Sequence, residues 1–191
     1  MARIISLFLL RRLGWRIETQ YESLPQKYVL IAAPHTSNWD FIIGLLARSA
    51  LGVRINYVGK ASIFRPPFGW LFRWLGGHPV DRSRSQGYVD AVVRLFKAKD
   101  AFAICIAPEG TRKRVDRLKT GFYYIAKGAK VPVLMAKFDW GCRQITVSAP
   151  FHPSGDTTGD FQQIRAFYAG AVGKHPRQGF NYRREPDLAG H

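Results

Sequence analysis

A histidine and an aspartate lie five residues apart in the segment Ala33-Pro34-His35-Thr36-Ser37-Asn38-Trp39-Asp40. An imidazole can remove a proton near neutral pH, and a carboxylate beside it can fix its tautomer and stabilise the imidazolium. On one continuous helix the two side chains would point about 140° apart. They can meet only if His35 lies in a loop and Asp40 in the first helical turn, as Pro34 and the capping residues Ser37 and Asn38 indicate. The segment therefore predicts a general base and its orienting carboxylate.

A simpler interpretation is that Asp40 only completes a capping box with Ser37, and that His35 is an ordinary loop residue. The spacing alone leaves both interpretations open. Neither a Gly-x-Ser-x-Gly sequence nor a reactive-cysteine context supplies a nucleophile. If His35 is a base, its proton would therefore come from a substrate hydroxyl, without a covalent enzyme intermediate.

Two predicted strands end directly before residues that can do chemistry. Short runs that are apolar except for Lys27 occupy positions 27–33 and 102–107, and each stops at a proline, Pro34 or Pro108. Such runs are typical of strands buried on both faces of a parallel sheet. Sites in these sheets form beyond the carboxyl ends of the strands. We therefore expect His35 and the segment Glu109-Gly110-Thr111-Arg112 at one edge of a sheet.

The remaining pattern alternates strands with helices. Further strands are predicted at 54–58, 131–136 and 144–147, and helices at 39–50, 66–75, 86–99, 120–129 and 161–171. This alternation predicts a single α/β domain with a mostly parallel or mixed central sheet flanked by helices. We place the domain at residues 21–175, after an N-terminal segment at 1–20 and before a polar tail at 176–191 that should fray.

The helix at 66–75 is predicted to have one core face and two outward tryptophans. The core face would consist of Phe64, Phe68, Leu71, Phe72 and Leu75. Trp70 and Trp74 fall on the other side, where exposure is costly unless something apolar covers them. We interpret them as membrane or lipid contacts, with burial under the N-terminal segment as the alternative. Lys60, in the Gly59-Lys60 pair that follows the alternating residues 54–58, is another candidate contact to a pocket or membrane.

The apolar stretch at 4–10 is far shorter than the roughly 20 residues that cross a bilayer. Arg11 and Arg12 follow it, so it is either an interfacial helix on an anionic membrane or a helix packed on the core. The sequence leaves both alternatives open.

The composition favours an anionic partner. The chain has 29 Lys and Arg against 13 Asp and Glu, a formal net charge of +16. Nucleic acid, an anionic membrane, a phosphorylated substrate and an acidic carrier protein all fit this charge. The basic residues follow no nucleic-acid reader motif, which argues against a nucleic-acid-binding protein. Cys105 and Cys142 form neither a disulfide framework nor a metal spacing, so a reducing cytoplasm is the default.

Four short blocks occur in one order over about residues 27–150. They are His35-x-x-x-x-Asp40, Gly77-x-x-Val80-Asp81-Arg82, Pro108-Glu109-Gly110-Thr111-Arg112 and Val131-Pro132-Val133. Together they resemble the glycerolipid acyltransferases of the lysophosphatidic acid acyltransferase type. The resemblance implies acyl transfer from acyl-CoA or acyl carrier protein to a hydroxyl of a lysophospholipid acceptor, with no other cofactor and no metal. Because the apolar stretch at 4–10 is too short to span a bilayer, we expect peripheral attachment to the cytoplasmic face of a membrane.

The resemblance further implies roles for individual residues. His35 would be the general base and Asp40 its orienter, while Arg82 and Glu109-Gly110-Thr111-Arg112 would hold the acceptor phosphate. Guanidinium groups suit bidentate phosphate contacts. Glu109 is an awkward phosphate neighbour, so we expect it to bind an arginine or an acceptor hydroxyl. Pro132 would either shape the pocket or simply start a strand.

The chain departs from many members of this family, which carry long N-terminal hydrophobic helices. Only residues 4–15 and the two tryptophans Trp70 and Trp74 offer membrane contacts here. The acceptor therefore stays open between lysophosphatidic acid and the acceptors of lysophospholipid-remodelling or ornithine-lipid enzymes.

Overall fold

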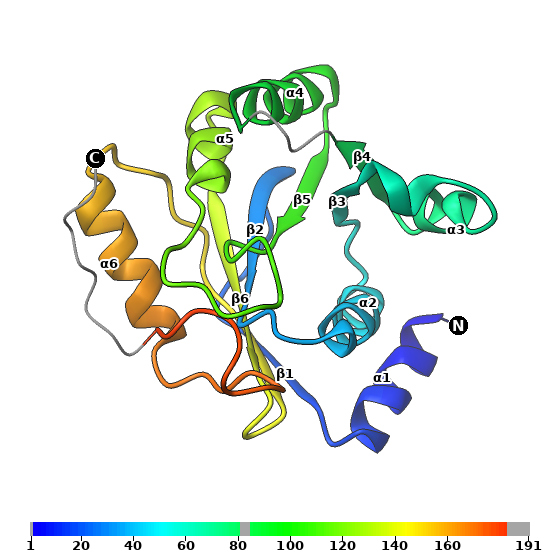
Figure 1. Ribbon diagram of the computed structural model, residues 1–191. Coiled ribbons are helices and arrows are strands. Elements are labelled where there is room, and N and C mark those ends of the chain that lie inside the picture. Colours follow the sequence, from blue (N-terminus) through cyan, green and yellow to red (C-terminus); the bar gives the residue numbers. More distant parts are fainter. Residues whose placement is uncertain (1, 81–84, 183–191) are drawn as a thin grey trace.

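The computed structural model describes residues 2–80 and 85–182, and within them one seven-stranded sheet runs in the order β1-β7-β6-β2-β5-β3-β4 (Figure 1). All neighbouring strands are parallel except the antiparallel pair β6 and β7. The prediction of a mixed α/β sheet is confirmed. The strands are β1 Arg16–Thr19, β2 Lys27–Ala33, β3 Asn56–Lys60, β4 Gly77–Val80, β5 Phe102–Ile106, β6 Val133–Asp139 and β7 Gln144–Val147.

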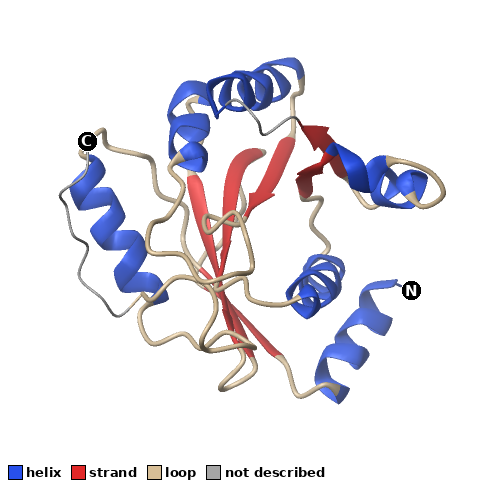
Figure 2. Ribbon diagram, in the orientation of Figure 1, coloured by secondary structure: helices blue, strands red, loops and turns tan. Residues whose placement is uncertain are grey.

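Helices cover both faces of this sheet, as Figure 2 shows. The α-helices are α1 Ala2–Arg12, α2 Asn38–Leu51, α3 Gly69–Trp74, α4 Ser85–Ala98, α5 Gly121–Ala129 and α6 Thr157–Tyr168, with a 3-10 helix at Ala61–Phe64. Val29 and Ile31 of β2 pack with α4, α5 and α6, while Leu30 between them packs with α1 and α2. Because successive side chains alternate between faces, the apolar run of β2 supplies two cores.

The edge strand β1 was not predicted. Residues 16–19 were expected to belong to the N-terminal segment, but they pair with β7 in parallel. Their sequence Arg-Ile-Glu-Thr contains one apolar residue and therefore carries no signal of a buried strand. Its neighbour Trp15 is buried in the core beneath α2.

The N-terminal helix α1 has one packed face and one exposed face. Leu10 is buried in the core, and Nε of Arg3 donates to the carbonyl of Ala50 in α2. Ile4, Ile5 and Phe8 are exposed. Packing on the core is thus confirmed for one face only. None of the described helices combines the length and apolar character needed to cross a membrane.

The segment around α3 differs from its prediction. The helix begins at Gly69, so Phe68 lies before it and is 64% exposed, and its assignment to the core was wrong. Trp70 and Trp74 are 68% and 78% exposed, which excludes their burial under the N-terminal segment. The predicted outward orientation of the two tryptophans is correct.

Candidate active site

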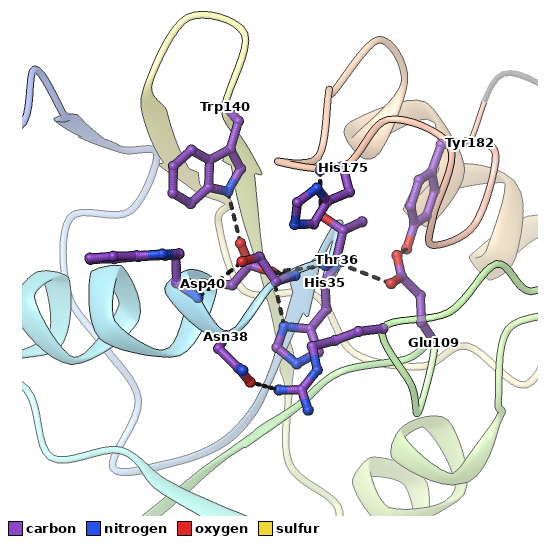
Figure 3. A network of polar contacts seen from close by, with 11 residues as sticks. His35, Thr36, Asn38, Asp40, Glu109, Trp140, His175 and Tyr182 are labelled. Carbon is purple, nitrogen blue, oxygen red and sulfur yellow. Dashed lines mark hydrogen bonds and ion pairs between the residues drawn. The ribbon is translucent and has the colours of Figure 1, made fainter.

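The turn between β2 and α2 brings His35 and Asp40 together (Figure 3). His35 lies in the loop after the strand, and Asp40 is in the first turn of α2. Oδ2 of Asp40 accepts from the backbone N–H groups of Thr36 at 2.8 Å and Ser37 at 2.7 Å, and lies 3.3 Å from Nδ1 of His35. Ser37 also caps the helix in a capping box with Asp40. The capping and pairing interpretations of Asp40 therefore both hold.

Asp40 is positioned and ionised by its neighbours. Its side chain is only 4% exposed, and burial alone would raise its pKa. Hydrogen bonds from His35, from the Ser37 N–H and from the indole of Trp140 outweigh burial and hold the pKa below its usual value. The side chain of His35 is 27% exposed. Since Nδ1 faces Asp40, Nε2 is the nitrogen available to a ligand.

Glu109 ties the loop after β5 to the His35 turn. It is fully buried, and Oε2 accepts from the backbone N–H of His35 at 3.0 Å. Tyr182 donates its hydroxyl to Oε1 at 3.3 Å. Burial raises the pKa of Glu109, although these bonds and one from the Phe180 N–H oppose the rise. Among the described residues no basic side chain forms an ion pair with Glu109, and an acceptor hydroxyl would find it covered. The described partners of Glu109 are the His35 N–H and the Tyr182 hydroxyl, and the expected arginine or acceptor-hydroxyl partner stays a prediction.

The residues after Glu109 form a tight basic loop next to the pair. Gly110 has φ +68°, a left-handed conformation that favours glycine and would be strained with another side chain. The guanidinium of Arg112 donates to Oδ1 of Asn38, two residues before Asp40. Oγ1 of Thr111 accepts from the N–H of Lys113. Glu109 and Arg112 thus each link the β5 loop to the turn that carries the histidine.

A cavity of about 1650 Å³ opens at this point. Its polar part includes His35, Asn38, Thr111, Arg112 and Lys119. Its apolar part extends between α2 and the sheet and includes Leu30, Ala32, Ala47, Leu134, Ala136, Phe138, Ile145 and Val147. The imidazole therefore stands where a cationic mouth meets an apolar chamber.

Among the described residues, three further predicted site residues, Pro132, Trp70 and Trp74, do not join this cluster. Arg82 lies outside the described residues, and of Lys60 only its position at the end of β3 is described. Pro132 precedes β6 at its amino end, and its carbonyl accepts from the N–H of Val29. That position is the opposite end of the sheet from His35, so Pro132 starts a strand and does not line the cavity. Trp70 and Trp74 belong to α3 and do not line it either.

The C-terminal segment, residues 172–182, contributes contacts that the sequence did not suggest. Residues 176–182 were assigned to a fraying tail, but the N–H of Val115 donates to the carbonyl of Gly179, and Tyr182 is buried against Glu109. The N–H of His175 donates to Oγ1 of Thr36. The tail prediction is therefore wrong up to residue 182. No motif marks these residues, whose contacts arise only from the tertiary fold.

Trp140 is a further residue that sequence reasoning missed. It follows β6, which is parallel to β2 and next to it, so it lies at the carboxyl edge that carries His35. Sites in such sheets form beyond the carboxyl ends of the strands, so the position of Trp140 after a strand could have identified it as a candidate. Its Nε1 donates to Oδ1 of Asp40 at 2.8 Å. Within residues 2–80 and 85–182, no three His, Cys, Asp or Glu side chains are placed to hold a metal ion.

Curated proteins and solved structures resemble the chain. Proteins named 1-acyl-sn-glycerol-3-phosphate acyltransferase from Saccharomyces cerevisiae, Streptococcus pneumoniae and Cocos nucifera are 29%, 30% and 29% identical over 59%, 57% and 42% of this chain. The matches span 39%, 40% and 28% of those proteins, less than half of each. The crystal structure of the 1-acyl-sn-glycerophosphate (LPA) acyltransferase PlsC from Thermotoga maritima shares the fold with a TM-score of 0.58, at 17% identity over 85% of this chain and 73% of that one.

The model of the Acyltransferase family matches residues 16–150, which include the His35–Asp40 turn and the loop at Glu109 to Arg112. This match covers every strand of the described sheet, from β1 to β7. The chain belongs to the Acyltransferase family.

Proposed function

We propose that the protein transfers a fatty acyl group from an acyl thioester to a hydroxyl of a lysophosphatidic-acid-like acceptor. The observation that carries the proposal is the position of the His35–Asp40 pair, between an apolar chamber and a cationic mouth. An acyl chain suits the chamber and a phosphate suits the mouth. The whole cavity, polar mouth included, exceeds the roughly 300–1,000 Å³ usual for small-molecule sites.

His35 acts as general base in the proposed reaction. Nε2 takes the proton from the acceptor hydroxyl as its oxygen attacks the thioester carbonyl, while Asp40 stabilises the imidazolium. When the tetrahedral intermediate collapses, the carbon–sulfur bond breaks and the leaving thiolate takes the proton from Nε2. Cys105 lines the cavity, but burial raises the pKa of its thiol to about 12, so it is a poor nucleophile. Direct transfer without an acyl-enzyme follows.

The donor and acceptor are tested by measuring thioester consumption with the purified protein. The donors are acyl-CoA and acyl carrier protein loaded with the same chain. The acceptors are lysophosphatidic acid, a lysophosphatidylcholine-type lysophospholipid and a lyso-ornithine lipid. We expect the highest kcat/KM with lysophosphatidic acid, because its phosphate monoester carries the most negative charge to the basic mouth. Equal or higher kcat/KM with either other acceptor would contradict the proposed acceptor class. No turnover with any pair would contradict the activity.

Replacing Arg112 with alanine should raise the acceptor KM about 10-fold or more and leave the donor KM nearly unchanged. A hydrogen bond to a charged group contributes about 1.5–3 kcal/mol, and Arg112 supplies such donors to the acceptor phosphate in this proposal. Arg114→Ala is the matched control, since Arg114 is in the same loop, is exposed and does not line the cavity. Steady-state kinetics with each substrate varied in turn measure both constants. Equal effects on the donor KM and the acceptor KM would contradict the proposal that Arg112 binds the acceptor phosphate. Arg82 keeps the same predicted role.

We further propose that the protein attaches to the cytoplasmic face of an anionic membrane without spanning it. Exposed apolar side chains occur on α1 (Ile4, Ile5, Phe8), α2 (Trp39, Ile42) and in or beside α3 (Phe68, Trp70, Trp74). These three helices lie on the same side of the molecule, at the right of Figure 1. Arg11 and Arg12 at the end of α1 are exposed and add attraction to anionic lipid.

The double variant Trp70→Ser/Trp74→Ser should bind anionic vesicles at least about 10-fold more weakly, because burying one large apolar side chain contributes about 1.5–3 kcal/mol. Sedimentation with vesicles of phosphatidylglycerol and phosphatidylcholine measures the bound fraction. Tyr124→Ser serves as control, since Tyr124 is a half-exposed aromatic residue on α5. Unchanged binding of the double variant would exclude these tryptophans from the membrane contact.

A further inference from the structure

We propose that Trp140 is a positioning residue of the catalytic pair, which holds the carboxylate of Asp40 through its indole N–H. The inference rests on the proposed general-base role of His35. Trp140 comes from the turn after β6, and Asp40 comes from α2, so the contact joins two elements 100 residues apart. Figure 3 shows the indole pointing at the carboxylate from the side away from His35.

The two oxygens of Asp40 have different partners. Oδ2 accepts from the N–H groups of Thr36 and Ser37 and faces His35. Among the described residues, the donor to Oδ1 is the Trp140 indole at 2.8 Å. A carboxylate with one oxygen unpaired in a buried site would rotate or take up a proton. The indole N–H therefore fixes the plane of the carboxylate and keeps Oδ2 directed at Nδ1.

The indole is itself held on several sides. The ring of Trp15 meets it edge-on with centroids 4.9 Å apart, and the backbone N–H of Trp140 donates to the carbonyl of Val172. Nζ of Lys174 lies 4.8 Å from the centroid of Trp140 and 4.7 Å from that of Trp39. A cation held between two aromatic faces is a stabilising arrangement. The C-terminal segment thus fixes Trp140, and Trp140 fixes Asp40.

The pH dependence of the pair also depends on the charges around it. These are Lys174 on the indole face, Arg112 bonded to Asn38, Glu109 bonded to the N–H of His35, and Asp139, which accepts from the N–H groups of Gly141 and Val172. A substitution at Trp140 leaves the charges of Arg112, Glu109 and Asp139 unchanged, but it changes one of the two rings that Lys174 contacts. The Trp140 hydrogen bond is strongest when the pair carries no extra proton, so its loss favours protonation of the pair.

Two substitutions separate the N–H from the bulk of the indole. Trp140→Phe keeps an aromatic ring and removes the donor. In Trp140→His, Nε2 occupies the same ring position relative to Cγ as Nε1 of tryptophan, so a neutral imidazole can keep the donor. We expect Trp140→Phe to lower kcat on the order of 10-fold with little change in either KM, because positioning affects the transition state. The acid limb of kcat/KM should move to higher pH, and Trp140→His should restore most of kcat above pH 8.

Trp15→Phe is the matched control, because Trp15 shares the aromatic packing and makes no contact to Asp40 that the structure records. It should lower the melting temperature without moving the acid limb. An unmoved acid limb in Trp140→Phe, or a histidine variant no better than phenylalanine, would overturn the inference. If His35→Ala loses activity while Trp140→Phe behaves as the wild type, the general-base role of His35 is supported and the positioning role of Trp140 is contradicted.

A measurement on the unmodified protein tests the coupling between Trp140 and the His35–Asp40 pair even if Trp140→Phe does not fold. The indole Nε1–H resonance of Trp140 in ¹⁵N-labelled protein should titrate with the same midpoint as the acid limb of kcat/KM, because the indole senses the protonation of the pair. A resonance that stays flat through that pH range would show that the contact is only structural and would overturn the proposal.

Discussion

His35→Ala should lower kcat by about 10²- to 10⁴-fold, the range that general base catalysis contributes. The variant loses the nitrogen that takes the hydroxyl proton, while the chamber and the basic loop keep both substrates in place. The KM values should therefore change little. The backbone N–H of His35, which donates to Glu109, is kept by alanine, so the loop geometry should survive. Steady-state kinetics with acyl-CoA and lysophosphatidic acid measure the loss.

The matched control for this substitution is His152→Ala, because His152 is exposed and lies outside the cavity. Its kinetics should equal those of the wild type. Melting temperatures of both variants should stay within a few degrees of the wild type, since the His35 side chain is partly exposed and its ion-pair partner among the described residues is Asp40. Turnover near the wild-type rate in a folded His35→Ala protein would contradict the proposed mechanism.

Asp40→Asn should lower both activity and stability. Each oxygen of the carboxylate accepts at least one hydrogen bond, from Thr36 and Ser37 on one side and Trp140 on the other. An amide has one acceptor oxygen, so its NH₂ group must face a donor in either orientation. We expect a loss of about 1–3 kcal/mol in the free energy of unfolding and a fall in kcat of about 10²- to 10⁴-fold. Chemical denaturation and kinetics measure the two effects separately.

The stability loss in Asp40→Asn should depend on pH in a definite direction. The native pKa of Asp40 lies below its unfolded value, so its charged form stabilises the fold above the usual aspartate range. That contribution disappears as the pH falls through the lower native pKa. The difference between wild type and variant should therefore be largest near neutral pH and narrow in acid. Asp116→Asn, at an exposed position, is the control substitution. If the difference in free energy of unfolding between wild type and variant did not depend on pH, the charge of Asp40 would not contribute to the stability of the fold.

The sequence predicted the fold wherever a buried element left a periodic pattern. The runs at 27–33 and 102–107 form β2 and β5 because both of their faces are covered, which favours apolar residues at nearly every position. The edge strand β1 could not be found this way, since it binds β7 mainly through its backbone and its side chains are largely exposed. Phe68 was wrongly assigned to the core because the predicted helix at 66–75 began too early. The α-helix α3 begins only at Gly69, so the helical spacing does not apply to Phe68.

The site was predictable where its residues are close in the chain. His35 and Asp40 meet through a local turn whose proline and cap are visible in the sequence. Glu109 was correctly placed beside the site, but its partners come from distant segments, the backbone of His35 and the hydroxyl of Tyr182. Tyr182 lies outside the family match and follows no periodic element. Such contacts depend on how the sheet and loops assemble, so no local pattern indicates them.

Some side chains that line the cavity also belong to the hydrophobic core, so substitutions there affect both substrate binding and stability. Leu30, Ala47, Leu134, Ala136 and Ile145 line the cavity and also form the core between α1, α2 and the sheet. Under the proposed function an acyl chain would complete the packing of that core. The range of chain lengths accepted and the stability of the fold then depend on the same side chains. Widening the chamber for a longer chain removes core contacts, at about 2–5 kcal/mol for truncation of a buried Leu or Ile to alanine. Substrate range and thermal stability should therefore change together, in opposite directions, as these positions vary.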